Sequence, residues 1–165
     1  MHLFYRIDRV RWSQLSSAES QNAREKLEKL CAANSAISNP QLRTYANIGG
    51  KADLAFFLLA AELAQISQLH RDLENCFPPG TLIPVFNYFS VTELSEYTSS
   101  DEENQQMLIN EEKLTPDSDE FKKRIAEIRD RMAKYEHYRL YPELPDWEVM
   151  AFYPMSKRRQ SQDNW

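Results

Sequence analysis

The stretch LRTYANIGGKADLAFFLLA, residues 42–60, decides the expected fold. Residues 42–48 alternate apolar and polar side chains, which is typical of a half-buried β-strand. Gly49-Gly50 interrupts this pattern, and the nearly continuous apolar run over 52–60 indicates a buried strand. Two strands that are separated by a glycine break form a hairpin. The sequence therefore predicts a β-hairpin at this point of the chain.

On each side of the hairpin we expect a helix and then a strand. Before it, the capping box Ser16–Glu19 begins a helix, and residues 3–10 alternate as a strand. After it, residues 63–73 carry one apolar helical face, and residues 82–94 form a long strand. The order strand, helix, strand, strand, helix, strand is the ferredoxin-like split βαβ plan. The fold class is therefore α+β, with an antiparallel sheet and the helices on one face.

The second face of such a sheet has no helix to cover it. Phe86 and Tyr88 share one side of the fourth expected strand, so this face carries aromatic rings. Large exposed apolar patches mark interaction sites. We therefore expect another sheet, another subunit or a ligand to cover the second face.

Composition narrows the class of protein. The 165 residues carry a net charge of −5 and have a pI of about 5.3, which argues against nucleic acid as the main partner. No apolar run approaches the roughly 18 residues that a membrane span needs, and the start does not resemble a signal peptide, so we expect a cytoplasmic protein.

The three glycines cannot supply a Rossmann or P-loop motif. Cys31 and Cys76 are too far apart for a CxxC pair; a disulfide and two free thiols both remain open, the thiols being the simpler expectation.

The chain divides into three parts, which are an N-terminal ferredoxin-like half (1–98), an acidic connector with an amphipathic helix (99–146) and the start of a C-terminal half (147–165). Residues 96–119 are acidic and poor in core residues, so we expect an exposed, partly mobile connector there. Residues 116–135 carry one apolar helical stripe. Residues 147–157 alternate as a fifth strand, and Pro154 places it at an edge or a bulge.

Tyr153, Met155 and Lys157 share one face of this fifth strand. At roughly 3.3 Å per residue, the first and last of them lie about 13 Å apart, a span that matches a large planar ligand. A phenol, a thioether and an ammonium in this order suit a porphyrin with anionic substituents, because the ammonium pairs with a carboxylate. Taken alone, however, the pattern is more typical of a strand whose buried face ends in solvent.

Longer motifs are more specific. Residues 151–159, Ala-Phe-Tyr-Pro-Met-Ser-Lys-Arg-Arg, followed by Asp-Asn-Trp at 163–165, closely resemble the chlorite dismutase-like family, and most of all its branch of coproheme decarboxylases. Three further stretches resemble that family in the same order along the chain: Gly50-Lys-Ala-Asp-Leu54, Phe89-Ser-Val-Thr-Glu-Leu-Ser95 and Arg139-Leu-Tyr-Pro-Glu-Leu-Pro145.

This resemblance implies an architecture. Members of the family hold two ferredoxin-like halves in a dimeric α+β barrel, and their subunits usually form a homo-oligomeric ring of five. The haem lies in the second half, and its proximal histidine follows the Asp-Asn-Trp stretch. None of His2, His70 and His137 matches that ligand, so we expect His70 on a helix surface and His137 in the connector near the rim of the pocket. The chain is then expected to be an N-terminal fragment, inactive alone, with its metal ligand beyond Trp165.

The resemblance also implies a reaction and the residues that perform it. Coproheme decarboxylases use hydrogen peroxide to convert coproheme III (Fe-coproporphyrin III) to haem b. Tyr153 matches the catalytic tyrosine, which gives an electron to the oxidised coproheme; the resulting tyrosyl radical attacks a propionate, and loss of carbon dioxide leaves a vinyl group. Met155 would pack on the porphyrin, and Lys157 and Arg139 would each hold a propionate. Pro154 and Ser156 complete the wall that runs from Tyr153 to Lys157.

Two departures and two alternatives accompany this interpretation. Ser156 stands where some relatives have aspartate, and the acidic connector is longer than expected. One alternative is a chlorite dismutase, which splits chlorite to chloride and dioxygen at haem b; the Tyr-Pro-Met motif argues against it. The other is a non-catalytic oligomerisation module without a cofactor. Haem titration separates the second alternative from both enzymes.

Overall fold

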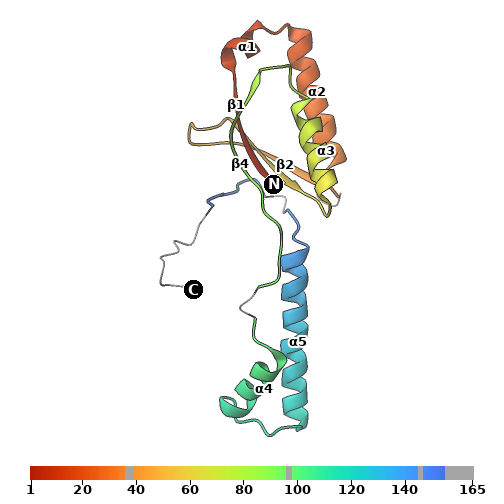
Figure 1. The fold of residues 1–165 in the computed structure, drawn as a ribbon, viewed down its shortest axis with the longest axis vertical. Helices are drawn as coiled ribbons and strands as arrows, with labels where there is room; N and C mark the ends of the chain where they lie inside the picture. The colour runs from red at the N-terminus through yellow and green to blue at the C-terminus, as the bar shows by residue number, and fades with distance from the viewer. Residues whose placement is uncertain (36–38, 96–97, 145–146, 155–165) are drawn as a thin grey trace.

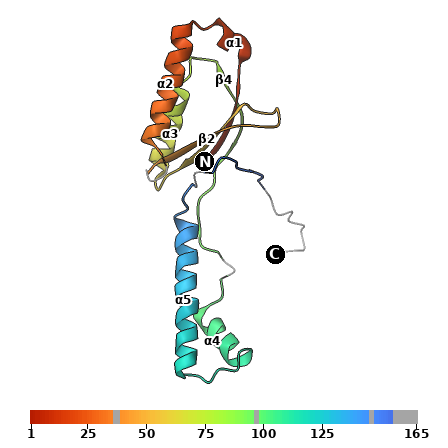
Figure 2. The same ribbon diagram turned by 180° about the vertical axis from the view of Figure 1, so that it is seen from behind.

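The computed structural model describes residues 1–35, 39–95, 98–144 and 147–154. The elements in chain order are β1 (His2–Ile7), α1 (Arg9–Gln14), α2 (Ser17–Ala33), β2 (Gln41–Ala46), β3 (Leu54–Leu59), α3 (Leu63–Glu74), β4 (Leu82–Tyr88), α4 (Asp101–Asn110) and α5 (Asp119–Leu140). The strands form one antiparallel sheet in the order β2-β3-β1-β4. Helices α2 and α3 cover one face of the sheet, and α4 and α5 project from one end of it (Figures 1 and 2). The predicted α+β, ferredoxin-like plan is confirmed.

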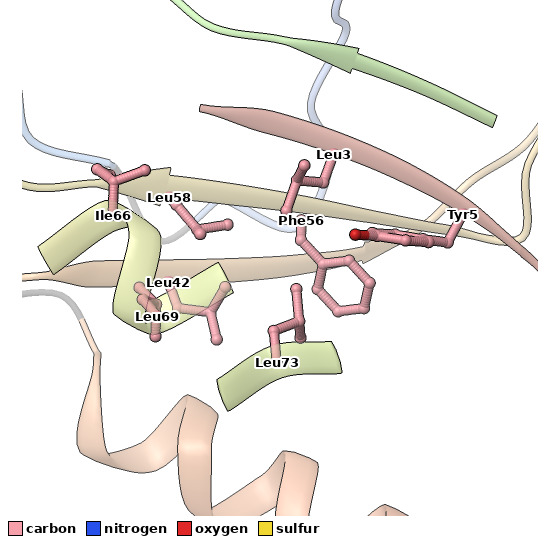
Figure 3. Packing of buried hydrophobic residues seen from close by; sticks show 8 residues of the cluster. All are labelled: Leu3, Tyr5, Leu42, Phe56, Leu58, Ile66, Leu69 and Leu73. Carbon is pink, nitrogen blue, oxygen red and sulfur yellow. The ribbon is translucent and has the colours of Figure 1, made fainter. Parts of the chain in front are cut away.

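The core lies between the sheet and helices α2 and α3 (Figure 3). Alternation along β1 sends Leu3 and Tyr5 into this core, where each is only 2% exposed. They pack with residues from β2, β3 and α3, namely Leu42, Phe56, Leu58, Ile66, Leu69 and Leu73. Fully burying a side chain of this size stabilises the fold by about 1.5–3 kcal/mol. The same alternation sends His2 and Phe4 to the opposite face of the sheet.

The hairpin between β2 and β3 closes as the sequence predicts. Ala46 pairs with Leu54, and the tip turns through Gly49 and Gly50, whose φ angles of 133° and 77° favour glycine. Asp53 fixes this hairpin to the rest of the sheet: its carboxylate accepts hydrogen bonds from the backbone N–H of Ile7 at 2.8 Å and from the guanidinium of Arg9 at 2.9 Å. These bonds hold the pKa of Asp53 below its usual value, with the Ile7 amide as the largest cause.

Two of the expected strands are shorter than predicted. The first ends at Ile7 rather than residue 10, because the carboxylate of Asp8 accepts a hydrogen bond from the N–H of Arg11 and caps α1. The fourth ends at Tyr88 rather than residue 94. Tyr88 pairs with His2, the first residue of β1, so the partner strand ends there and offers no further ladder to residues 89–94.

Residues 101–110, within the stretch expected to be an exposed and partly mobile connector, form the helix α4. Ser100 and Glu103 form a capping box at its start, the same signal that begins α2. Helix α4 turns back onto α5 as a helical hairpin with its own hydrophobic cluster, made of Leu108, Phe121, Ile125 and Ile128. Leu108 is completely buried.

The fifth strand predicted over 147–157 is absent from residues 147–154, and residues 155–157 lie outside the described residues. A strand needs a hydrogen-bonded neighbour, and no described segment forms a ladder with 147–154. Cys31 and Cys76 are free thiols, which decides between the two alternatives left open above. Among the residues that the structure describes, no helix is long and apolar enough to cross a membrane.

The separation of the two hydrophobic clusters generates a first prediction. Leu108→Ala should lower the free energy of opening of the α4–α5 hairpin by about 2–5 kcal/mol, the usual cost of a buried Leu→Ala change. Hydrogen exchange should then accelerate in α4 and α5 and stay unchanged in β1 and β3. Leu73→Ala in the sheet core is the control and should show the reverse. Equal loss of protection in both regions after Leu108→Ala would show that the clusters unfold together.

Asp53 generates a second prediction. Because its pKa is lowered in the folded state, its carboxylate stabilises the fold above the ordinary aspartate pKa of about 3.9, and this contribution is lost as the pH falls through the folded-state value. Asp53→Asn should therefore melt at a lower temperature than the parent at pH 7, and the gap should shrink towards pH 2.5. Melting curves followed by circular dichroism across this range test it; a gap that is independent of pH would exclude the carboxylate charge as the cause.

Candidate functional site

The segment 147–154 runs along the sheet face that α2 and α3 leave open, beside the N-terminus of β1 (Figures 1 and 2). Phe152 is the residue through which this segment packs on the sheet. The Phe152 ring stacks on His2 with centroids 4.6 Å apart and an angle of 27° between the planes, and its centroid lies 5.3 Å from that of Phe4. It also meets Phe57 edge-on at 5.8 Å and Tyr88 at 6.4 Å. Three strands thus contribute to one aromatic cluster around Phe152.

The sequence led us to expect another sheet, another subunit or a ligand on the open face, whereas in the described residues the segment 147–154 of the same chain covers part of it. Phe57 at the centre of the cluster is only 4% exposed, whereas Phe86 and Tyr88 on the edge strand β4 remain 45% and 42% exposed. The cover over the described residues is therefore a segment of the same chain, and it protects β1 and β3 better than β4. Phe152 was not among the residues that the sequence singled out, although the alternation places it on the side opposite Tyr153.

The imidazole ring of His2 packs against the aromatic rings of the cluster. Burial among the aromatic side chains lowers its pKa, and the nearby N-terminal ammonium lowers it further. The Nδ1 atom of His2 is buried and has no hydrogen-bond partner among the described residues. A neutral imidazole is the form that such an apolar site favours.

Tyr153 has the opposite environment. With Phe152 held against the sheet, its neighbour points away and is 71% exposed. Pro154 and Ala151 are exposed as well. A phenol that is presented to the outside by a partly buried neighbour can contact a ligand bound against this segment. The remaining predicted wall residues, Met155, Ser156 and Lys157, lie outside the described residues.

Arg139 lies at the end of α5 and is held there. Its Nε donates to the carbonyl oxygen of Glu93 at 3.3 Å, and another guanidinium nitrogen donates to the hydroxyl of Tyr135 at 3.1 Å. The guanidinium carbon also lies 5.7 Å from the centre of the Tyr135 ring. No hydrogen bond, ion pair or ring contact joins Arg139 to Tyr153 within the part of the chain that is described. The structure therefore does not bring these two predicted site residues together.

A porphyrin with its carboxylates needs a pocket and cations that face it. Of the predicted site residues, Tyr153 presents an exposed phenol, while the Arg139 guanidinium is occupied by its own helix and by Glu93. They do not by themselves form a haem pocket. No group of three His, Cys, Asp or Glu side chains lies together as a metal site in the described ranges.

The histidines are placed as follows. His70 was expected on a helix surface, but its Nε2 lies 2.8 Å from the hydroxyl of the buried Tyr5, whose hydroxyl also donates to Glu74 at 3.2 Å. Burial raises the pKa of Tyr5 well above its usual value, and Glu74 adds to this effect. His70 therefore hydrogen-bonds to the Tyr5 hydroxyl at the edge of the core. The ring of His137, near the end of α5, lies 5.2 Å from that of Tyr141.

The two other motifs, residues 89–95 and 139–145, form hydrogen bonds that connect the end of α5 to neighbouring segments and to the sheet. In the stretch 89–95, the Thr92 hydroxyl donates to the carbonyl of Leu140 at 3.0 Å, which ties this segment to the end of α5. In the stretch 139–145, the N–H of Leu144 donates to the Gln41 side chain, and the Leu144 carbonyl accepts a bond of 3.0 Å from Arg43. These bonds connect the chain after α5 to β2, from where residues 147–154 continue along the open face.

The role of Phe152 gives a third prediction. Phe152→Ala should expose His2 and raise its pKa towards the ordinary value of about 6.5, because burial is the largest cause that lowers it. The change should also cost less than about 3 kcal/mol, the lower end of the range for a fully buried phenylalanine, since Phe152 is only partly buried. An NMR titration of the His2 ring measures this shift. Tyr153→Ala, one residue away and exposed, is the control and should leave the His2 pKa unchanged. An unaltered pKa in the Phe152 variant would show that other residues bury His2.

Comparison with known families agrees with the motifs. The family model described as Chlorite dismutase matches residues 17–165, which is most of the chain. The match spans α2, the hairpin, both helices of the α4–α5 pair and the segment that carries Tyr153. Members of this family are haem-binding oxidoreductases. The chain belongs to the chlorite dismutase family.

Proposed function

We propose that this protein takes part in the peroxide-dependent oxidative decarboxylation of coproheme III to haem b, with Tyr153 as its redox-active residue. The observation that carries the proposal is the exposed phenol of Tyr153, presented by the anchored Phe152 within the motif Tyr153-Pro154-Met155. Membership of a haem-binding family supports the cofactor class.

The overall reaction balances with one peroxide for each propionate. A propionate, R–CH₂CH₂–COO⁻, reacts with hydrogen peroxide and one proton to give the vinyl group R–CH=CH₂, carbon dioxide and two waters. The propionate loses two electrons and peroxide accepts them. When bound, the iron porphyrin supplies the oxidising equivalents from peroxide. Tyr153 would give up an electron and its phenolic proton and would recover a hydrogen from the propionate side chain, which accounts for one of the two electrons. The second electron would pass from the propionate to the remaining oxidising equivalent of the peroxide as carbon dioxide leaves.

The other residues of the chain bind and orient. Lys157 would pair with one propionate, and Met155 would pack against the porphyrin, with Pro154 and Ser156 in the same wall. Arg139 would pair with a second propionate only after it leaves the Glu93 carbonyl and the Tyr135 hydroxyl that it now contacts. Among the proposed site residues that the structure describes, Arg139 is therefore the one whose side chain has to move before it can bind a propionate. By resemblance to the family, we propose an axial histidine after Asp163-Asn164-Trp165, in a second ferredoxin-like half, and a homo-oligomer of five subunits.

Chlorite dismutation is the second candidate, because the matching family model carries that description. It converts chlorite to chloride and dioxygen and needs no tyrosine that donates an electron. Dioxygen release on addition of chlorite to the haem-loaded protein would favour it. Conversion of coproheme to haem b on addition of peroxide would favour the decarboxylase.

Tyr153→Phe gives a fourth prediction, to be tested in a polypeptide that includes the proposed haem half. The variant should bind coproheme nearly as the parent does, because the ring supplies the packing, and should form no haem b with peroxide, because the phenolic hydrogen is gone. Chromatography of the porphyrin products and coproheme titration measure the two effects. Tyr138→Phe on α5, which is exposed to nearly the same extent (69%), is the matched control and should keep full activity. Normal haem b formation by the Tyr153 variant would remove this residue from its role.

Lys157→Ala separates positioning from chemistry. It removes a cation from a carboxylate, so coproheme binding should weaken by about 1.5–3 kcal/mol, roughly tenfold to more than a hundredfold in dissociation constant. Decarboxylation at saturating coproheme should fall less than in Tyr153→Phe. Unchanged binding by this variant would place Lys157 away from the propionates.

A further inference from the structure

One polar cluster lies at the edge of the sheet core and has no part in the proposed reaction. Tyr5 of β1 is only 2% exposed, and its ring packs edge-on against Phe56 with centroids 5.9 Å apart (Figure 3). Its hydroxyl oxygen lies 2.8 Å from Nε2 of His70 and 3.2 Å from Oε1 of Glu74. The two partners are one turn apart on α3, and their own Nε2 and Oε1 atoms lie 3.5 Å from each other. A buried phenol thus has two bases at its hydroxyl.

The phenol of Tyr5 is held in its protonated form. Burial raises its pKa well above the usual value, and the charge of Glu74 and the hydrogen bond to it add to this effect. A neutral phenol that loses an electron becomes a strong acid, so its oxidation is easy only where a base takes the proton at the same time. Nε2 of His70 lies within the reach of about 2.6–3.2 Å that is expected of such a base. Imidazole is also a stronger base than a carboxylate, with an ordinary pKa of about 6.5 against about 4.3 for glutamic acid.

The neighbouring carboxylate and the burial distinguish Tyr5 from the other tyrosines. After the proton has moved, the carboxylate of Glu74 lies beside an imidazolium, and an opposite charge so close stabilises that form. No other phenol in the described part of the chain has an imidazole as its hydrogen-bond partner. Tyr138, Tyr141 and Tyr153 are 65–71% exposed, so a radical on any of them is open to reaction with dissolved molecules. A radical on Tyr5 is enclosed by the core.

A short route connects Tyr5 to the open face of the sheet. Tyr5 and Phe4 are consecutive residues of β1 and point to opposite faces. The centroid of the Phe4 ring lies 5.3 Å from that of Phe152, which directly precedes Tyr153. One ring contact and two backbone connections therefore join the phenol at position 153 to the phenol of Tyr5. Electrons move more readily along covalent bonds and packed rings than through solvent, so this route couples the two tyrosines.

We propose that Tyr5 is a second redox-active tyrosine, which gives an electron towards the open face and its phenolic proton to Nε2 of His70. Its oxidant is a one-electron oxidant at position 153; in this chain that is the tyrosyl radical of Tyr153, so the inference rests on the proposed function for its oxidant. In this step Tyr5 becomes a neutral tyrosyl radical and His70 becomes an imidazolium. Tyr153 is reduced by the electron from Tyr5 and takes a proton from solvent, which restores its phenol. Tyr5 thereby removes an oxidising equivalent that meets no propionate.

A photochemical experiment on the 165-residue chain tests this step without haem. A ruthenium tris(bipyridine) complex is attached to the thiol of Tyr153→Cys, in a chain whose own thiols are removed by Cys31→Ala and Cys76→Ala. A light flash in the presence of a sacrificial electron acceptor turns the complex into a one-electron oxidant at position 153. Electron paramagnetic resonance then follows the tyrosyl radical. Electron–nuclear double resonance in deuterium oxide detects the deuteron that is hydrogen-bonded to its oxygen.

The labelled parent should form a long-lived tyrosyl radical with a coupled exchangeable deuteron, which is the one transferred to His70. Tyr5→Phe, which keeps the ring in the core, should lose this long-lived signal. His70→Leu should change the deuteron coupling and form the radical roughly tenfold more slowly, because the remaining carboxylate of Glu74 is the weaker base. Tyr138→Phe, an exposed tyrosine of α5, is the matched control and should behave as the labelled parent does.

Two results would overturn the proposal. A long-lived radical that survives in Tyr5→Phe would place the oxidising equivalent on another tyrosine, such as Tyr88 beside Phe152. An unchanged rate and an unchanged deuteron coupling in His70→Leu would show that His70 is not the proton acceptor. The experiment contains neither haem nor the phenol of Tyr153, so its result is independent of haem b formation by Tyr153→Phe, which tests the proposed function.

Discussion

The alternation of β1, in the middle of the sheet, is the constraint on which the rest of the structure depends. Because β1 pairs with β3 on one side and with β4 on the other, both of its edges are hydrogen-bonded within the sheet. Leu3 and Tyr5 face the helices and close the core, while His2 and Phe4 face the opposite side. A slip of one residue would exchange these two sets. The fold and the candidate site are therefore set by the same strand.

The candidate site follows from the second of these faces. His2, Phe4, Phe57 and Tyr88 form an aromatic surface, and Phe152 packs on it. Because Phe152 packs on this surface, the phenol of the next residue, Tyr153, is exposed. The family motifs at 50–54, 89–95 and 139–145 contribute structure to this arrangement: Asp53 closes the hairpin, Thr92 holds α5, and Leu144 is bonded to β2. Motifs that identify a haem-binding family thus act, in this half of the fold, as supports of the segment with the proposed chemistry.

The α4–α5 hairpin is a second structural unit with a different origin of stability. Its cluster around Leu108 shares no residue with the sheet core. Arg129 forms a pair of hydrogen bonds with Asp101, and these bonds lower the pKa of the Asp101 carboxyl; Arg124 bonds to Glu112 in the loop between the helices. Acidic residues that suggested a mobile connector are therefore caps and ion-pair partners of a folded hairpin. Exposed pairs of this kind contribute little each, so the buried leucine is the main support.

The sequence by itself determined the order of the elements in the sheet half, the glycine turn at 49–50, the capping box at Ser16 and the family, because these depend on periodicity, local turn chemistry and contiguous motifs. It did not determine where strands end, since β4 ends at Tyr88, which pairs with His2, the first residue of β1. The sequence prediction missed α4, although Ser100 and Glu103 carry the same capping-box pattern as Ser16 and Glu19. The burial of Leu108 against Ile125 and Ile128 depends on the tertiary structure. The anchoring role of Phe152 and the separation of Arg139 from Tyr153 likewise required the tertiary structure. These features arise from contacts between segments many residues apart, and local patterns carry no information on which distant side chains will meet.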